Sequence, residues 1–154
     1  MCMELFVASD QPIERSHGWK GEAFLTVEEV DAEDESVRRH LTLPHVRYLG
    51  AHTGCSCGFE YGLATPERET GAEQDQAGRR SVSALRDFLE VHLEAGASLQ
   101  LLSRWFTEAS LAPDASDVSV DFFGGESFVL PHNAVLRVGR AVEQRDEADE
   151  ARDR

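Results

Sequence analysis

Residues 82–106 constrain the fold of this chain more than any other segment, because two patterns of different period follow each other there. Residues on one face first recur at the spacings of three and four that are typical of an α-helix: Val82, Leu85, Phe88, Leu89, His92 and Leu93. Ser81 stands at the expected N-cap, and Gly96 stands where the chain would leave the helix. Residues 98–106 then alternate and predict a strand that is apolar on both faces, although a second helix is also possible there.

Two more segments alternate with the period of two that is typical of strands. Residues 2–8 place Met3, Leu5 and Val7 on one face and Cys2 on the other. Residues 46–50 predict a strand that delivers His52 and two cysteines at its end. Weaker patterns predict a short helix at 31–41, strands at 23–30 and 135–138, a return strand at 59–61, and a hairpin at 118–130 around Gly124-Gly125.

The length and the order of these elements predict one α/β domain of the α+β type. A chain of 154 residues is long enough for a single core and too short for two. We expect a mixed or antiparallel sheet with two to three helices over residues 1–142. Residues 63–80 lack periodicity and predict a long mobile loop, whereas residues 143–154 are acidic and predict a disordered tail.

The charge of the chain excludes several classes of partner. Fifteen Lys and Arg against 29 Asp and Glu give a net charge of −14, which disfavours binding to nucleic acid and to anionic membranes. No apolar run reaches the roughly 20 residues that span a bilayer, and the first ten residues do not resemble a secretory signal. We therefore expect a cytoplasmic protein, for which a protein partner or a small molecule remains open.

The segment His52-Thr-Gly-Cys55-Ser-Cys57-Gly58 concentrates most of the chemistry in the sequence. In an extended backbone Cys55 and Cys57 would point to the same face, and the flanking glycines would permit a sharp turn. His52 could add a nitrogen ligand, and Cys2 could complete a Cys3His set if its strand pairs beside the strand that ends at His52. Ligand softness favours zinc over iron or copper. We expect such a metal to have a structural or sensing role rather than a role in an enzyme.

Three other interpretations of the same residues stay open. Cys55 and Cys57 could form a strained, easily reduced disulfide and act in thiol redox chemistry. One of them could be a nucleophile activated by His52, His45 or His132, or Cys2 could be an N-terminal nucleophile after removal of Met1. The thiols could also be small buried hydrophobes, which would leave an acidic protein-interaction module without chemistry.

Two stretches together, residues 1–10 (MCMELFVASD) and 48–59 (YLGAHTGCSCGF), resemble an uncharacterised family of small bacterial proteins. The resemblance covers about a third of the chain. It implies no activity and assigns no role to any residue. It does imply that the two cysteine segments belong to one domain.

Overall fold

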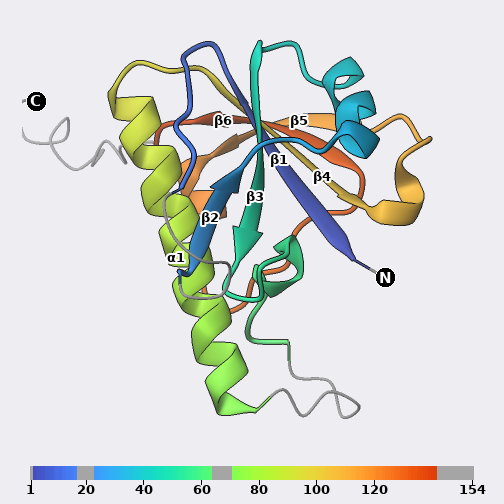
Figure 1. Ribbon diagram of the computed structural model, residues 1–154. Helices are drawn as coiled ribbons and strands as arrows, with labels where there is room; N and C mark the ends of the chain where they lie inside the picture. Colours follow the sequence, from blue (N-terminus) through green and yellow to red (C-terminus); the bar gives the residue numbers. More distant parts are fainter. Residues whose placement is uncertain (1, 17–22, 64–70, 142–154) are drawn as a thin grey trace, which may run out of the picture.

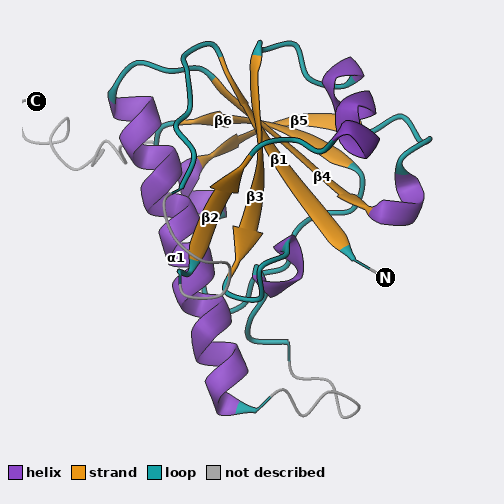
Figure 2. Ribbon diagram, viewed as in Figure 1, coloured by secondary structure: helices purple, strands orange, loops and turns teal. Residues whose placement is uncertain are grey.

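A six-stranded mixed sheet forms the centre of the molecule (Figures 1 and 2). The computed structural model describes residues 2–16, 23–63 and 71–141. The strands follow the order β2-β3-β1-β4-β6-β5, in which only β5 and β6 are parallel. Their bounds are β1 Met3–Ser9, β2 Leu25–Glu28, β3 His45–Ala51, β4 Leu99–Trp105, β5 Asp114–Ser119 and β6 Ala134–Gly139. This confirms the predicted single α+β domain.

One long helix and four short 3-10 helices complete the described part of the chain. The helix α1 covers Ala72–Glu94. The 3-10 helices are η1 Ala32–Arg39, η2 Ser56–Gly58, η3 Phe106–Glu108 and η4 Val120–Phe122. None of these helices is long and apolar enough to cross a lipid bilayer.

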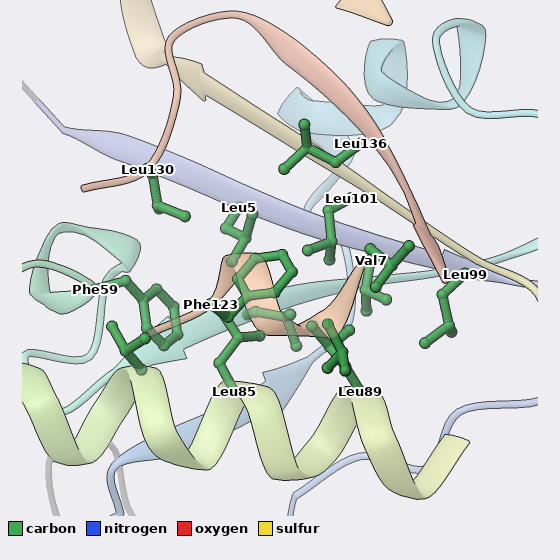
Figure 3. Packing of buried hydrophobic residues seen from close by; sticks show 14 of the residues in the cluster. Leu5, Val7, Phe59, Leu85, Leu89, Leu99, Leu101, Phe123, Leu130 and Leu136 are labelled. Carbon is green, nitrogen blue, oxygen red and sulfur yellow. The ribbon is translucent and has the colours of Figure 1, made fainter. Parts of the chain in front are cut away.

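The two faces of the sheet carry separate apolar clusters. The larger one packs under α1, where Leu85 and Leu89 meet Leu5 and Val7 of the central strand (Figure 3). The smaller one lies on the face of η1 and contains Phe6, Ala8, Val37, Leu41, Val46, Leu102 and Val135. Alternate residues of β1 and β4 therefore point into different clusters, which confirms the strand with two apolar faces predicted at 98–106 and shows the same arrangement in β1.

The start of α1 corrects the predicted loop at 63–80. Residues 72–80 belong to the helix, and residues 64–70 lie outside the described part of the chain. The helical pattern of apolar residues does not extend before Val82, because small residues, Gly78 and Ser81, occupy the buried positions of the helix there. Ser81 is therefore not the N-cap, whereas Gly96, at φ +87°, follows the helix end as expected.

The predicted hairpin at 118–130 is also wrong. Residues 114–119 form β5, which pairs in parallel with β6, and residues 120–122 turn into η4. The turn into η4 buries Phe123 rather than Phe122. The expected return strand at 59–61 is reduced to one bridge between Tyr61 and Phe128. The tail predicted at 143–154 lies outside the described residues.

Candidate functional site

The turn that carries the cysteines begins where β3 ends. The Ala51 N–H donates to the Cys55 carbonyl at 2.9 Å, and the Gly54 N–H donates to the Ala51 carbonyl at 2.9 Å. Gly54 has φ +79°, a conformation that glycine adopts without steric cost. Cys55 is extended, but Ser56 starts the 3-10 helix η2. The spacing alone suggested an extended backbone from Cys55 to Cys57. The structure corrects this prediction, because the backbone becomes helical at Ser56.

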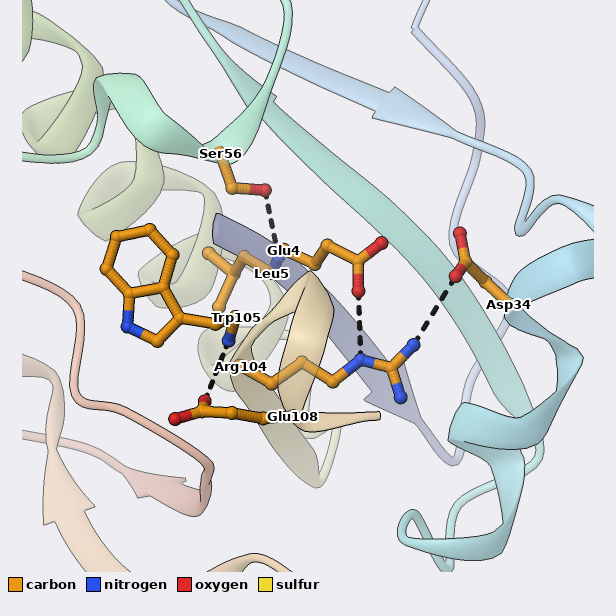
Figure 4. A network of polar contacts seen from close by, with 7 residues as sticks. All are labelled: Glu4, Leu5, Asp34, Ser56, Arg104, Trp105 and Glu108. Atoms are coloured by element: carbon orange, nitrogen blue, oxygen red, sulfur yellow. Dashed lines mark hydrogen bonds and ion pairs between the residues drawn. The ribbon is translucent and has the colours of Figure 1, made fainter. Parts of the chain in front are cut away.

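The turn is docked on the edge of β1. The ladder between β1 and β3 ends at the pair Phe6 and Tyr48, so the first residues of β1 have no backbone partner in β3. Side chains of η2 replace that partner: the Leu5 N–H donates to Ser56 Oγ at 2.8 Å (Figure 4), and the Met3 N–H donates to Cys57 Sγ at 3.2 Å. This arrangement fixes Cys57 against the central strand.

Ser56 holds the turn from the other side as well. Its hydroxyl donates to the Leu49 carbonyl at 2.7 Å, and its N–H donates to the Tyr48 hydroxyl at 3.2 Å. Burial raises the pKa of Tyr48, and the bond from Ser56 only partly offsets that rise, so the phenol stays protonated at neutral pH. The residue between the cysteines is thus a buried anchor rather than a spacer.

The two half-buried thiols contact each other and have different acidities. Burial alone would raise the pKa of Cys55, but hydrogen bonds from the Thr53 hydroxyl and from Cys57 outweigh it and lower that pKa. The Thr53 hydroxyl donates to the Cys55 carbonyl at 3.0 Å and also lies 3.4 Å from Cys55 Sγ, where either atom can be the donor. Burial raises the pKa of Cys57 to about 11, with further increases from Cys55 and from Cys2. The pair therefore loses its first proton from Cys55 and keeps the second on Cys57.

His52 is held by a residue of α1. Its backbone N–H donates to Ser81 Oγ at 3.0 Å, and its ring Nδ1 lies 3.0 Å from the same oxygen. Burial lowers the pKa of His52, so its ring is neutral at pH 7. The helix approaches closely here, since a Cβ at Gly78 would collide with the Glu60 carbonyl. A Cβ at Gly58 would meet the His52 ring at 2.9 Å, which explains that glycine.

A pocket of about 240 Å³ opens beside the turn. His52 and Cys57 line it together, and Cys55 is not among its lining residues. Tyr61, Glu60 and Asp75 form part of its wall. A second cavity, of about 30 Å³, lies between Cys57, Trp105 and His132 and is too small for an organic ligand. Cys57 therefore faces the space that a small molecule could occupy.

The other residues singled out in the sequence take different positions. Cys2 is exposed and contributes to the raised pKa of Cys57. His45 is the first residue of β3, and the cysteine turn follows the last, about 20 Å away along the strand. His45 therefore cannot serve as a base for either cysteine. Among the described residues no three His, Cys, Asp or Glu side chains are placed to hold a metal ion. The zinc site at Cys2, His52, Cys55 and Cys57 remains a prediction.

A charged cluster that the sequence did not predict lies on the η1 face of β1 (Figure 4). Arg104 Nε lies 2.9 Å from Glu4 Oε2, and Arg104 Nη2 lies 3.3 Å from Asp34 Oδ1. Arg104 is 2% exposed, its Nη1 has no hydrogen-bond partner among the described residues, and its guanidinium lies 5.5 Å from the Phe6 ring. Burial and the neighbouring Asp34 together raise the pKa of Glu4 more than Arg104 lowers it.

Ser81 was missed as well, although the sequence holds a weak signal for it. Small residues at 78 and 81 continue the buried face of the helix backward from Val82, which is typical of a close approach between elements.

No protein-family model, curated protein or solved structure matches the chain.

Proposed function

We propose that this chain is a thiol-redox protein in which Cys55 and Cys57 alternate between a dithiol and an intramolecular disulfide. The observation that carries the proposal is the placement of two half-buried cysteines on either side of the buried anchor Ser56 in one turn, where Cys57 Sγ accepts the Met3 N–H at 3.2 Å and Cys55 Sγ lies 3.4 Å from the Thr53 hydroxyl. The pKa of Cys55 is lowered and that of Cys57 is raised, so Cys55 loses its proton first, and thiol–disulfide exchange proceeds through such a thiolate.

The backbone of the turn is compatible with a disulfide. Ser56 is helical, and a helical residue separates its two neighbouring Cα atoms by about 5.4 Å, as the radius and rise of a helix require. Disulfides join Cα atoms about 4.4 to 6.8 Å apart. Oxidation would therefore need rotation of the two side chains and little movement of the backbone.

The hydrogen bonds of the turn favour the reduced form. Thr53 and the Cys57 backbone stabilise the Cys55 thiolate, and that stabilisation is lost when Cys55 Sγ becomes part of a disulfide. A stabilised reduced form makes the corresponding disulfide a stronger oxidant. We therefore expect the reduction potential to fall when the Thr53 hydroxyl is removed, as in Thr53→Val.

A redox titration tests the proposal. The protein is equilibrated in thiol–disulfide buffers, quenched with acid, alkylated and weighed by mass spectrometry. Oxidation should remove two hydrogens and protect Cys55 and Cys57 together, with the same midpoint in the control variant Cys2→Ser. The variants Cys55→Ser and Cys57→Ser should show no such transition. Failure of the Cys2→Ser protein to form this disulfide in any buffer would overturn the proposal.

The same preparation tests the zinc hypothesis. Protein purified under reducing conditions without a histidine tag is analysed for metals. One equivalent of zinc that is lost in Cys2→Ser, and that blocks alkylation of Cys55 until a chelator is added, would favour the Cys3His site over a redox role. Cys2 is the residue that separates the two hypotheses, because only the metal site needs its sulfur.

A further inference from the structure

We infer that Cys2 is a third redox cysteine, whose thiolate attacks Cys57 in the Cys55–Cys57 disulfide and forms a Cys2–Cys57 disulfide. This inference rests on the proposed redox function and adds a catalytic residue to it. Its basis is the Met3 N–H, which donates to Cys57 Sγ at 3.2 Å and belongs to the peptide bond that follows Cys2.

The peptide bond between Cys2 and Met3 is held at both of its polar groups. Its N–H donates to Cys57 Sγ, and its carbonyl, that of Cys2, accepts the Phe106 N–H at 3.0 Å. Because a peptide bond is planar, these two hydrogen bonds also fix the position of the Cys2 Cα. The backbone of Cys2 therefore lies beside Cys57, although Cys2 itself is exposed.

The distance between Cys2 and Cys57 follows from this hydrogen bond. In a trans peptide bond the Cα of one residue lies about 2.4 Å from the next nitrogen, on the side of its hydrogen. With Sγ 3.2 Å from that nitrogen, the Cys2 Cα lies about 4 Å from Cys57 Sγ and no further than about 5.6 Å. The three bonds from a disulfide Cα to the partner sulfur span about 3.4 to 4.5 Å at standard angles. Cys2 can therefore reach Cys57 by rotation of its side chain.

Cys57 is thus the sulfur that both other cysteines can reach. Cys55 is joined to it through the helical residue Ser56, and Cys2 through the Met3 amide. The N–H and the carbonyl of the Cys2–Met3 peptide bond are occupied by Cys57 and Phe106, so neither of them holds Cys55. Burial, then Cys55, and then Cys2 raise the pKa of Cys57, which agrees with this arrangement.

The exchange is balanced in atoms and electrons. The Cys2 thiolate attacks Cys57 Sγ, the S–S bond between Cys55 and Cys57 breaks, and Cys55 leaves as a thiolate. One disulfide replaces another, so no outside oxidant or reductant takes part. Cys55 is a good leaving group, because hydrogen bonds from Thr53 and Cys57 outweigh burial and lower its pKa, and a thiol of lower pKa leaves faster.

The exchange changes what the oxidised protein presents to its surroundings. Cys2 is exposed and the other two cysteines are half-buried, so the disulfide moves toward the surface. Cys55 then becomes a free nucleophile although the protein is still oxidised. If both disulfides are equally populated, the equilibrium constant of oxidation changes only twofold, which is about 9 mV at about 29.6 mV per tenfold. The midpoint of the titration above is therefore nearly the same with and without Cys2.

Two variants compare the pairs that Cys2 can form. Cys55→Ser keeps Cys2 with Cys57, and Cys57→Ser keeps Cys2 with Cys55. Each is equilibrated in glutathione buffers that contain a chelator, quenched with acid, digested and weighed. The equilibrium constant for an intramolecular disulfide in Cys55→Ser should exceed that in Cys57→Ser by at least about tenfold, because only Cys57 is held beside Cys2. Equal constants, or only mixed disulfides with glutathione in Cys55→Ser, would overturn the inference.

The parent chain provides a test without any substitution. It is oxidised with one equivalent of diamide, treated with iodoacetamide at pH 8 and digested with trypsin, which separates Cys2 from the other two cysteines. More than about a tenth of the protein should carry the alkyl group on Cys55, together with a peptide linked through Cys2 and Cys57. In oxidised Cys2→Ser, Cys55 should stay unalkylated. Alkylation of Cys2 alone in the parent would overturn the inference.

The outcomes separate the exchange from the redox function. If Cys2→Ser forms the Cys55–Cys57 disulfide and the parent is alkylated at Cys2 alone, the redox function stands and the exchange fails. If Cys2→Ser forms no disulfide in any buffer, the redox function fails and the exchange fails with it. Thermal unfolding of each variant confirms that the compared proteins are folded, and the parent measurement decides the question where a variant does not fold.

Discussion

An ion pair and a pair of thiols both lie at the first half of β1, and they differ in how easily they lose a proton. Glu4 and Arg104 form an ion pair with side chains 10% and 3% exposed, whereas Cys55 and Cys57 form a half-buried pair beside an open pocket. The charges of the first pair cannot be removed singly without leaving a buried ion. The second pair gives up one proton readily, because Thr53 and Cys57 stabilise the thiolate. The difference in burial thus separates a fixed ion pair within the sheet from a reactive thiol pair in the turn that packs against β1.

Removal of Arg104 should give the largest effect on stability. Arg104→Met leaves Glu4 buried without its partner and is expected to lower the free energy of unfolding by about 3 to 5 kcal/mol. Chemical denaturation measures it. Arg137→Met is the matched control, since the Arg137–Asp117 pair is exposed and its loss should cost less than about 1 kcal/mol. A similar loss in both variants would contradict the structural role of the buried ion pair. An altered alkylation profile of Cys55 in folded Arg104→Met would mean that the ion pair and the thiol pair are not independent.

Removal of the Ser81 hydroxyl should have an intermediate effect. Ser81→Ala leaves the His52 N–H without its acceptor inside the protein, which is expected to cost about 1 to 3 kcal/mol. Ser83→Ala on the exposed side of the same helix is the control and should change stability by less than about 0.5 kcal/mol. Equal stabilities of the two variants would mean that the bond between α1 and the turn contributes nothing.

Loss of the Thr53 hydroxyl should change reactivity more than stability. Thr53→Val removes a stabilising contact of the Cys55 thiolate, so the pKa of Cys55 should rise and its alkylation rate at pH 7 should fall by a factor of about 2 to 10. The rate is measured with iodoacetamide across pH in a Cys2→Ser background. Thr53→Ser keeps the hydroxyl and should keep the rate. An unchanged rate in Thr53→Val would mean that the contacts with Cys57 and with the backbone, and not Thr53, lower the pKa of Cys55.

The pH dependence of stability should give the smallest effect. Burial lowers the pKa of His52 below its ordinary value of 6.5, so the folded state binds fewer protons than the unfolded state as the pH falls. The contribution of His52 is therefore fully present above pH 6.5 and declines below it. Unfolding at pH 7.5 and 5.5 should show a smaller difference in His52→Gln than in the parent. His92, whose pKa burial also lowers, provides the comparison variant His92→Gln.

Local patterns predicted the elements whose side chains alternate strictly or recur with the helical period. The strands β1, β3 and β4 and the helix end at Gly96 are of this kind. The position of the cysteine turn after β3 also followed from the sequence, because a strand end determines where the next residues emerge. The contact between β1 and β3, which Cys2 and His52 suggested, is present as an antiparallel pair.

The missed features depend on contacts between distant residues. Glu4 and Arg104 are direct partners across β1 and β4, a register that neither strand specifies by itself. Ser81 looked like an N-cap because a buried serine and a capping serine are identical in sequence. The parallel pairing of β5 with β6 was hidden because an alternating segment carries no information about the direction of its neighbour.

The hydrogen bond from the Met3 N–H to Cys57 Sγ joins the backbone of the central strand to a sulfur whose chemical state can change. A thiol, a thiolate and a disulfide sulfur accept a hydrogen bond with different strength. The amide proton of Met3 is therefore a natural spectroscopic reporter of the turn. Its NMR shift and exchange rate should follow the oxidation of Cys57, while the neighbouring Leu5 amide, bonded to Ser56 Oγ, provides an internal reference on the same strand edge.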